Sequence, residues 1–246
     1  MAIAFVSVGT ALSGNAGTTT VSMAHAGTWV PGNIMLAGRT VKPSTATATD
    51  EPGWTAATNV TGGTGTAALD LGTTRGKVDY RVIIPGDASP ITFDQASTPD
   101  SVSGCLIQYS KNLWSFWEVV ATTGDDTTSG TGRTGTGSAI SLRAGDVIVA
   151  FVHSNTDLAT AYTAPAITAS GMTITTTMRL TQGGASQGND SGLAIYDGFV
   201  TAGTLASVAP AISLTGGPTS SGATSFVRLR EVLFPVTPTM ATMVPS

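Results

Sequence analysis

Ser186 lies in GASQG, at 184–188, which matches the G-x-S-x-G pattern of a nucleophilic serine on a sharp turn between a strand and a helix. In that arrangement the histidine that acts as general base follows the serine in the chain. Both histidines, His25 and His153, precede Ser186, and a polar NDSG and a strand-like pattern follow the motif in place of a helix. The motif therefore predicts a polar loop, and the sequence predicts no catalytic residue.

A second glycine-rich stretch, GTGRTGTG at 130–137, is only superficially like a phosphate-binding loop. It lacks the Lys-Ser/Thr pair that would contact the β- and γ-phosphates, and no helix follows to offer its N-terminal amides. The net charge of −4, from 11 Lys and Arg against 15 Asp and Glu, leaves no basic patch for a nucleic-acid backbone. We therefore expect no nucleotide cofactor and no nucleic-acid partner.

Metal-ligating residue types are few and scattered. The two histidines lie 128 residues apart and Cys105 is the single cysteine, so the spacing predicts no transition-metal site and no intramolecular disulfide. Cys105 itself is expected to be a buried free thiol. Asp125 and Asp126 stand side by side and could contribute oxygen ligands to a calcium ion, and the alternative is a solvated turn. We assign no metal and no other cofactor.

Four side chains are best able to bind a sugar by stacking: Trp29, Trp54, Trp114 and Trp117. In NLWSFWEVV, at 112–120, strand alternation places Trp114 and Phe116 on one face and Trp117 on the other, so we expect Trp117 to be buried. Trp54 follows the turn EPG. It either plugs one end of the domain or forms, with Trp29, a ligand platform for a host surface glycan.

The composition indicates a protein that works in an assembly. Charged residues make up 11% of the chain, against roughly 25% in an average soluble domain, while Thr, Gly, Ser and Ala dominate. A surface with few charges gives little electrostatic repulsion between molecules, so we expect a homo-oligomer or a subunit of a larger particle. The N-terminus lacks the Lys or Arg of a signal peptide, and no run approaches the ~20 apolar residues of a membrane helix. We expect synthesis in a host cytoplasm and no membrane insertion.

Short apolar runs bounded by Gly, Pro, Asn and Asp predict β-strands throughout. Helical periodicity is not sustained in any long window. Twelve strands are expected, at 3–8, 18–23, 34–40, 77–84, 105–109, 113–121, 139–142, 147–153, 172–180, 193–200, 212–214 and 225–234. This pattern predicts an all-β fold, a single antiparallel β-sandwich or jelly roll.

Two similar stretches, PGNIMLAG at 31–38 and AGDVIVAF at 144–151, indicate a weak internal duplication. Each is followed by a proline-containing turn, a polar glycine-rich loop and a strand that contains Tyr80 or Tyr196. We expect pseudo-repeats at 1–121 and 139–234. The segment 122–138 has no apolar side chain and is predicted to be an exposed polar hinge loop between the two pseudo-repeats. Both halves should share one domain, 1–234, because neither alone could cover its apolar face.

The last predicted strand, SFVRLREVLF at 225–234, should complete this domain. Alternation places three apolar side chains inward, at Val227, Leu229 and Leu233, and two cationic ones outward, at Arg228 and Arg230. The remaining 235–246 carries three prolines and no charged side chain, so it should leave the sheet as an extended arm. Its candidate partner contacts are Pro235, Val236, Met240, Met243 and Val244.

The order of these stretches resembles a group of tailed-bacteriophage virion proteins. The resemblance is carried by the opening IAFVSVGT, by PGNIMLAG and PGW, by VDYRV and by LWSFWEVVATTG, and it spans roughly residues 2–234. The usual Gly-Asp is replaced by Gly32-Asn33 in the first half and is present at Gly145-Asp146 in the second. The resemblance implies a β-sandwich on a phage particle, a head decoration or minor tail protein without enzymatic activity, and it transfers no binding residue.

Two functions are therefore expected from the sequence. The first is a structural protein of the virion, whose partners are capsid or tail subunits. The alternative is a receptor- or carbohydrate-binding adhesin module of a phage tail, for which the tryptophans and the long polar loops are the reason. A hydrolase is disfavoured because no base stands in the right place for Ser186.

Overall fold

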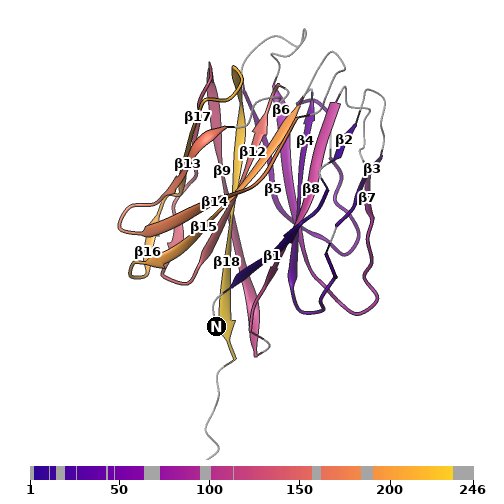
Figure 1. Cartoon of the computed structure of the whole chain (residues 1–246), viewed down its shortest axis with the longest axis vertical. Coiled ribbons are helices and arrows are strands. Elements are labelled where there is room, and N and C mark those ends of the chain that lie inside the picture. The colour runs from indigo at the N-terminus through magenta and orange to yellow at the C-terminus, as the bar shows by residue number, and fades with distance from the viewer. Residues whose placement is uncertain are drawn as a thin grey trace, which may run out of the picture.

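The computed structural model of the chain describes residues 3–10, 12–14, 20–25, 27–42, 44–46, 48–63, 73–94, 101–112, 114–156, 162–183 and 191–234. Within these ranges the chain forms eighteen strands and no helix, and the strands pair into several antiparallel sheets (Figure 1). The predicted all-β class is confirmed. No helix among these residues is long and apolar enough to cross a bilayer.

Two large sheets form the centre of the molecule. The first has the strand order β1 (Ala4–Val8), β8 (Ser101–Ser110), β4 (Ile34–Lys42), β6 (Thr74–Val82) and β5 (Thr55–Gly62), and the short β2 (Leu12–Gly14) also pairs with β8. The second has the order β9 (Ser115–Gly130), β18 (Ser220–Leu233), β12 (Val147–Ser154), β15 (Gly192–Ala202) and β14 (Thr173–Gly183). When the five strands of each sheet are numbered by their order in the chain, both sheets have the same spatial order: first, fifth, second, fourth and third.

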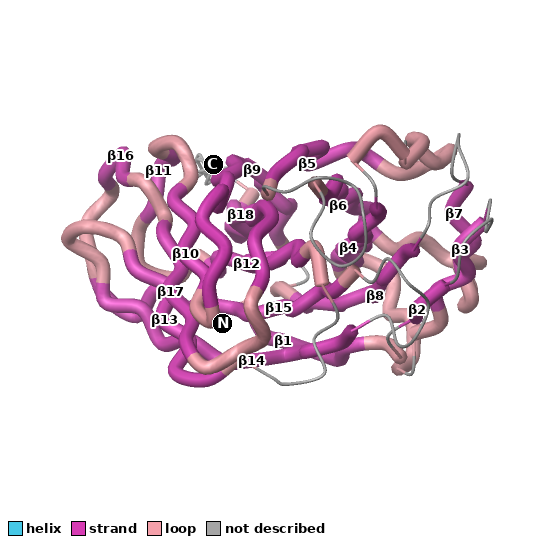
Figure 2. The backbone as a smooth tube through the Cα atoms, turned by 90° about the horizontal axis from the view of Figure 1, so that it is seen from above, coloured by secondary structure: helices cyan, strands magenta, loops and turns pink. Residues whose placement is uncertain are grey.

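Three smaller sheets cover the outer faces of these two. The pair β3 (Thr20–Met23) and β7 (Ile91–Asp94) covers the first large sheet. The second is covered by β10 (Arg133–Thr136), β17 (Ala211–Thr215) and β13 (Thr163–Thr168), together with the pair β11 (Ile140–Leu142) and β16 (Ala206–Val208). Seen from above, the molecule therefore has four layers, with the two large sheets in the middle (Figure 2).

Each interface between layers has its own hydrophobic core. The central core, between the two large sheets, includes Leu36, Ile107, Phe151, Val227 and Leu229. One outer core contains Val21, Met35 and Phe93, and the other contains Tyr196, Ile212 and Phe226. Because both faces of the central strands are covered, β4 and β12 are buried at every position. Their burial is therefore continuous and does not alternate between buried and exposed residues, as it would in a strand with one face in solvent.

The repeated stretches noticed in the sequence form the same turn. Gly32 and Gly145 both have a positive φ, of 90° and 92°. Gly32 N donates to Ile83 O at 2.8 Å, and Gly145 N donates to Val200 O at 2.9 Å. Each turn leads directly into a central strand, β4 or β12, so glycine is used at both sites for the backbone conformation that other residues rarely adopt.

Tyr80 and Tyr196, which follow the two similar stretches in the sequence, do not occupy equivalent positions in the two sheets. Tyr80 pairs with Leu36, the fourth residue after Gly32, whereas Tyr196 pairs with Ala150, the fifth after Gly145. This shift by one residue turns the side chains to opposite faces of their sheets. Accordingly, Tyr80 packs against the central core and Tyr196 lies in an outer core.

The predicted hinge loop at 122–138 is wrong. Residues 122–130 continue β9 and pair with β18, from Thr122 opposite Phe226 to Asp126 opposite Gly222 and, after a shift in register, Gly130 opposite Ser220. Residues 133–136 form β10. The glycines allow close packing, since a Cβ on Gly124 would lie 2.6 Å from the carbonyl oxygen of Thr136. A polar composition does not exclude a strand where backbone pairing and close approach replace apolar burial.

The predicted pattern of the last strand is partly wrong. Val227 and Leu229 are buried in the central core as expected, but Arg228 and Arg230 are buried too, since the neighbouring layer covers their face. Arg228 Nη1 donates to Ser141 O of β11 at 3.0 Å. Leu233, predicted to be buried, is 63% exposed because it lies at the end of β18.

The two matching turns lead to a stability prediction. Gly32→Ala and Gly145→Ala should each lower the free energy of unfolding by about 1–2 kcal/mol, because a non-glycine residue is strained at positive φ. No atom lies within 4 Å of a Cβ built at either position, so strain is the only cost. Chemical denaturation measures the change. Gly130→Ala, at a glycine in β9 without a positive φ, is the control and should change stability less; an equal loss in all three variants would contradict the turn assignment.

Candidate functional site

Trp29 and Trp54, the candidate ligand platform, lie on the outer face of the first large sheet. Both pack against the outer core around Phe93. The rings of Trp54 and Phe93 meet edge to face with centroids 5.1 Å apart, and Trp29 meets His25 at 6.2 Å in the same way. The two indoles are therefore used at least partly in packing, and their assignment as a sugar platform stays a prediction.

Trp117 is partly buried against the central core, and its Nε1 donates to Gly32 O at 3.0 Å. Cys105 is a buried free thiol, as predicted, and burial raises its pKa to about 12. A thiol with so high a pKa remains protonated at neutral pH and is a poor nucleophile. Ser186 and the arm residues Pro235, Val236, Met240, Met243 and Val244 lie outside the described residues.

The described residues contain no group of three or more His, Cys, Asp or Glu side chains placed to hold a metal ion. Asp125 lies in β9, where its Oδ1 accepts a hydrogen bond from Gly63 N at 3.1 Å. This contact links β9 to the end of β5. The side chain of Asp126 lies outside the described part of the chain, so the calcium hypothesis stays a prediction.

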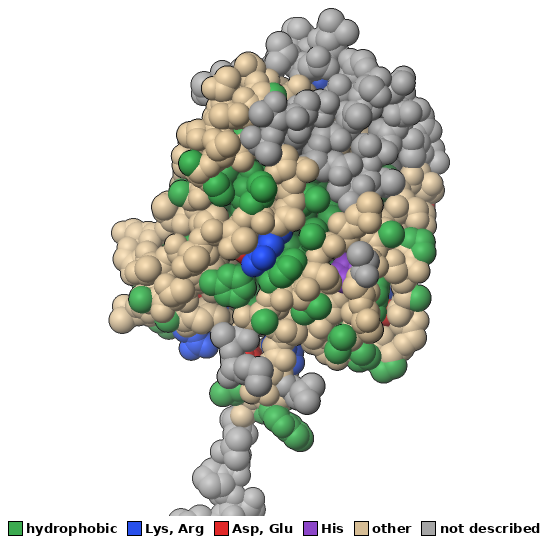
Figure 3. Space-filling view, in the orientation of Figure 1, with side chains coloured by type: hydrophobic (Ala, Val, Ile, Leu, Met, Phe, Trp, Pro, Cys, Tyr) green, Lys and Arg blue, Asp and Glu red, His purple; other side chains and the backbone are tan. Residues whose placement is uncertain are grey.

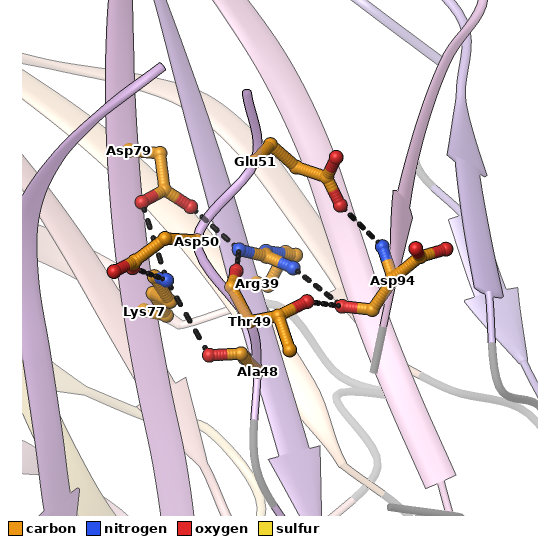
Figure 4. Close-up of polar contacts among 8 residues, drawn as sticks. All are labelled: Arg39, Ala48, Thr49, Asp50, Glu51, Lys77, Asp79 and Asp94. Atoms are coloured by element: carbon orange, nitrogen blue, oxygen red, sulfur yellow. Dashed lines mark hydrogen bonds and ion pairs between the residues drawn. The ribbon is translucent and has the colours of Figure 1, made fainter. Parts of the chain in front are cut away.

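A group of titratable side chains forms a buried cluster on the first large sheet (Figure 4). Arg39 of β4 donates to Asp79 Oδ2 of β6 at 2.5 Å, and Lys77 Nζ lies 3.5 Å from Asp79 Oδ1. All three side chains are at most 1% exposed. Lys77 also pairs with Asp50, whose side chain is 79% exposed. We call Arg39, Lys77, Asp79 and Asp50 the charge cluster.

The charge cluster fastens residues 48–51 to the sheet. Arg39 Nη2 donates to Thr49 O at 2.9 Å, and its guanidinium lies 4.5 Å from the centre of the Phe93 ring. Lys77 Nζ donates to Ala48 O at 3.3 Å. Burial raises the pKa of Asp79, and the charges of Arg39 and Lys77 oppose this shift. The charge cluster pairs charged side chains inside the fold. Its exposed group is the carboxylate of Asp50, which is the part of the cluster that a ligand could contact.

A second buried polar group joins the two large sheets. His153 Nδ1 lies 2.8 Å from Thr40 Oγ1, and His153 Nε2 lies 3.1 Å from Ser225 Oγ. Thr58 Oγ1 donates to Ser225 Oγ at 2.8 Å. The imidazole is fully buried, and desolvation followed by the nearby charge of Arg133 lowers its pKa to about 3. His153 is therefore neutral and links strands β4, β12 and β18 without reach to solvent.

Ser7 and His25 have the spacing of a nucleophile and its base, which sequence inspection missed because no motif links them. Ser7 Oγ lies 2.8 Å from His25 Nε2, and His25 Nδ1 lies 3.2 Å from Gly27 O. A Cβ on Gly27 would lie 2.6 Å from Ser7 Oγ, so Gly27 covers one side of the hydroxyl. His25 N also donates to Ser89 Oγ at 2.8 Å. We interpret these contacts as packing that fixes His25 and Gly27 beside β1.

The most distinctive surface feature lies where β9 begins and β18 ends. Four large apolar side chains are exposed there: Trp114 by 77%, Phe116 by 46%, Leu233 by 63% and Phe234 by 55%. The rings of Phe116 and Phe234 lie 5.8 Å apart, and Phe234 N donates to Trp114 O at 3.3 Å. Trp114, Phe116 and Phe234 lie on one face of the paired strand ends, whereas Leu233 stands opposite Ser115 and turns to the other face. We call Trp114, Phe116 and Phe234 the aromatic patch. It lies at the lower end of the molecule, where β9 and β18 extend farthest, and Figure 3 shows hydrophobic side chains there.

Polar contacts beneath the aromatic patch hold the two strand ends together. Glu231 Oε1 accepts hydrogen bonds from Asn112 N and from Ser115 Oγ, both at 2.8 Å. Ser115 Oγ also lies 2.7 Å from Asn112 O. These contacts fix the turn before β9 against the last residues of β18. The patch is therefore presented on a preorganised support, which lowers the entropy lost when a partner binds.

Comparisons of the chain with protein-family profiles, with curated protein sequences and with solved structures find no significant match.

The charge cluster can be tested by removing one partner at a time. Arg39→Met should lower the free energy of unfolding by about 3–5 kcal/mol, because it leaves Asp79 buried without its main partner. Asp50→Asn should lower it much less, since Asp50 is exposed and Lys77 keeps its contacts with Asp79 and Ala48. Denaturant titration distinguishes the two. Equal small losses would show that Asp79 does not depend on Arg39.

His153 should make stability depend on pH. The unfolded chain binds a proton at this imidazole below its ordinary pKa of 6.5, whereas the folded chain does so only near pH 3. The free energy of unfolding should therefore fall as the pH drops from about 6.5 toward 3, by about 1.4 kcal/mol per pH unit from this group. His153→Gln should remove this contribution, so the stability difference between the two proteins should shrink as the pH falls. A difference that is constant from pH 7 to pH 4 would contradict burial of a neutral imidazole.

Proposed function

We propose that the chain is a non-enzymatic structural protein of a bacteriophage virion, a capsid decoration or minor tail protein on the particle surface. The observation that carries this proposal is where the charges lie. In the part of the chain that the structure describes, nine charged residues are buried: Arg39, Lys42, Lys77, Asp79, Arg133, Asp146, Asp197, Arg228 and Arg230. A substantial part of an already sparse set of charges therefore lies inside the fold, and the composition leaves the surface rich in hydroxyl groups.

Such a surface suits a subunit in a symmetric particle. Few exposed charges mean little repulsion between copies, and repeated weak contacts add up when many subunits are held together. The exposed aromatic patch supplies an apolar contact in addition. The resemblance to tailed-phage virion proteins and the hydroxyl-rich surface both support the same role. Synthesis in the host cytoplasm and release in the particle would follow.

We further propose that the fold arose by duplication and forms one sandwich-like domain. The strands β1, β8, β4, β6 and β5 correspond in order to β9, β18, β12, β15 and β14, and the outer pair β3 and β7 corresponds to β11 and β16. The matching turns at Gly32 and Gly145 stand at the same point in both series. Each large sheet covers the apolar inner face of the other, so the halves depend on each other for the central core.

The alternative function is a receptor- or carbohydrate-binding module of a phage tail. The exposure of Trp114 favours it, because an indole that is 77% exposed can stack on a sugar ring. A glycan array probed with the purified protein and with Trp114→Ala would distinguish the two functions. Binding to a defined glycan that is lost in this variant would favour the adhesin.

Association with particles is the direct test of the proposed function. Phage particles from the strain that carries the gene should be banded in a density gradient and analysed by quantitative mass spectrometry. We expect peptides of this chain to co-sediment with the major capsid protein at a fixed ratio, while abundant host enzymes are depleted as the internal control. Recovery of the chain only in the soluble fraction of the lysate would contradict the proposal.

A further inference from the structure

The aromatic patch lies directly before the part of the chain that follows the last strand. Phe234 belongs to the patch, and residues 235–246 continue from it. This C-terminal segment has the sequence PVTPTMATMVPS, with four large apolar side chains and no charged one. The aromatic patch and the uncharged, apolar C-terminal segment are therefore adjacent in the sequence.

We propose that the aromatic patch is the docking surface for the C-terminal segment, residues 235–246, of a second copy of this chain. This inference rests on the proposed role in an assembly and names the contact by which two copies join. The surface and its occupant are both encoded in the one chain. No other protein is needed for the contact.

The chemistry of the segment fits the patch. Met240 and Met243 have flexible thioether side chains, which adapt to irregular apolar surfaces and make favourable contacts with aromatic rings. Docking would remove no charged side chain of the segment from water, so it avoids the free-energy cost of burying a charge. The prolines at 235, 238 and 245 restrict the free segment and reduce the entropy lost on binding.

The starting point of the segment favours a second copy over its own patch. Pro235 has no amide hydrogen and disfavours a helical conformation at Phe234, so this position does not favour a tight turn. To reach its own patch, which contains Phe234, the segment would have to fold back within a few residues. If a two-fold axis passes near Phe234, each copy can place its segment on the patch of the other, and the contact closes as a symmetric dimer.

The first experiment measures the mass of the full-length protein in solution by size-exclusion chromatography with light scattering. We expect a dimer or a larger oligomer. Trp114→Ser combined with Phe116→Ser should raise the dissociation constant at least about tenfold, because exposed aromatic anchors dominate such interfaces. Leu205→Ser is the matched control, since Leu205 is also 63% exposed but lies between β15 and β16. It should leave the mass unchanged.

The second experiment locates both halves of the contact by mixing. Deletion of 236–246 keeps the patch and removes the segment, whereas the double patch variant keeps the segment and removes the patch. Each alone should be monomeric with an unchanged melting temperature. Mixed at equal concentrations, they should form a heterodimer, because one intact patch and one intact segment remain.

The outcomes separate this inference from the proposed function. A monomeric full-length protein, deletion without effect on the oligomer, or a mixture that fails to associate would each overturn the exchange of C-terminal segments. A monomer whose patch becomes accessible to a hydrophobic dye only after deletion would show docking of the segment on its own chain, which also overturns it. None of these results bears on whether the chain co-sediments with particles, and loss of co-sedimentation would leave the dimer intact.

Discussion

The central strands of the two large sheets, such as β4 and β12, are buried on both faces, and most features of the molecule depend on this constraint. A strand between two apolar layers has no face on which a charged side chain can reach water. Arginine, lysine and aspartate in these strands must then find partners inside the fold, or the cost of burying them is several kcal/mol each. Arg39 with Asp79 meets this requirement in the first sheet, and Arg230 with Asp146 meets it in the second, with two contacts of 2.8 Å.

The same constraint explains the buried histidine and the thiol. His153 is held neutral because the space between the sheets supplies hydroxyl groups and no carboxylate partner among the contacts of its ring nitrogens. Cys105, on the neighbouring sheet, faces the same core and is kept protonated by burial. Groups that would be reactive at a surface are thus inert here, which is consistent with the proposed structural role.

The sequence predicted the fold class, the central strands and the repeated turn, because these follow from local patterns such as the apolar run after Gly32 and Gly145. It failed where a layer far away in the chain decides burial. Alternation placed Arg228 outward, but β11 covers that face and Ser141 accepts its hydrogen bond. Thr122 and Gly124 look like loop residues by composition, but pairing with β18 makes them part of a strand. The aromatic patch could not be predicted from the sequence, because the exposure of Phe116 and Phe234 depends on where the neighbouring layers end.

Because many charged side chains are buried, apolar and hydroxyl groups make up much of the surface offered to a neighbour, and the aromatic patch is an exposed apolar part of it. A cryo-EM reconstruction of the purified particle tests the central claim most directly. We predict a four-layered density on the particle surface into which the fold fits, with the start of β9 and the end of β18 turned toward a neighbouring subunit. A complete reconstruction of head and tail without such a density would contradict the account.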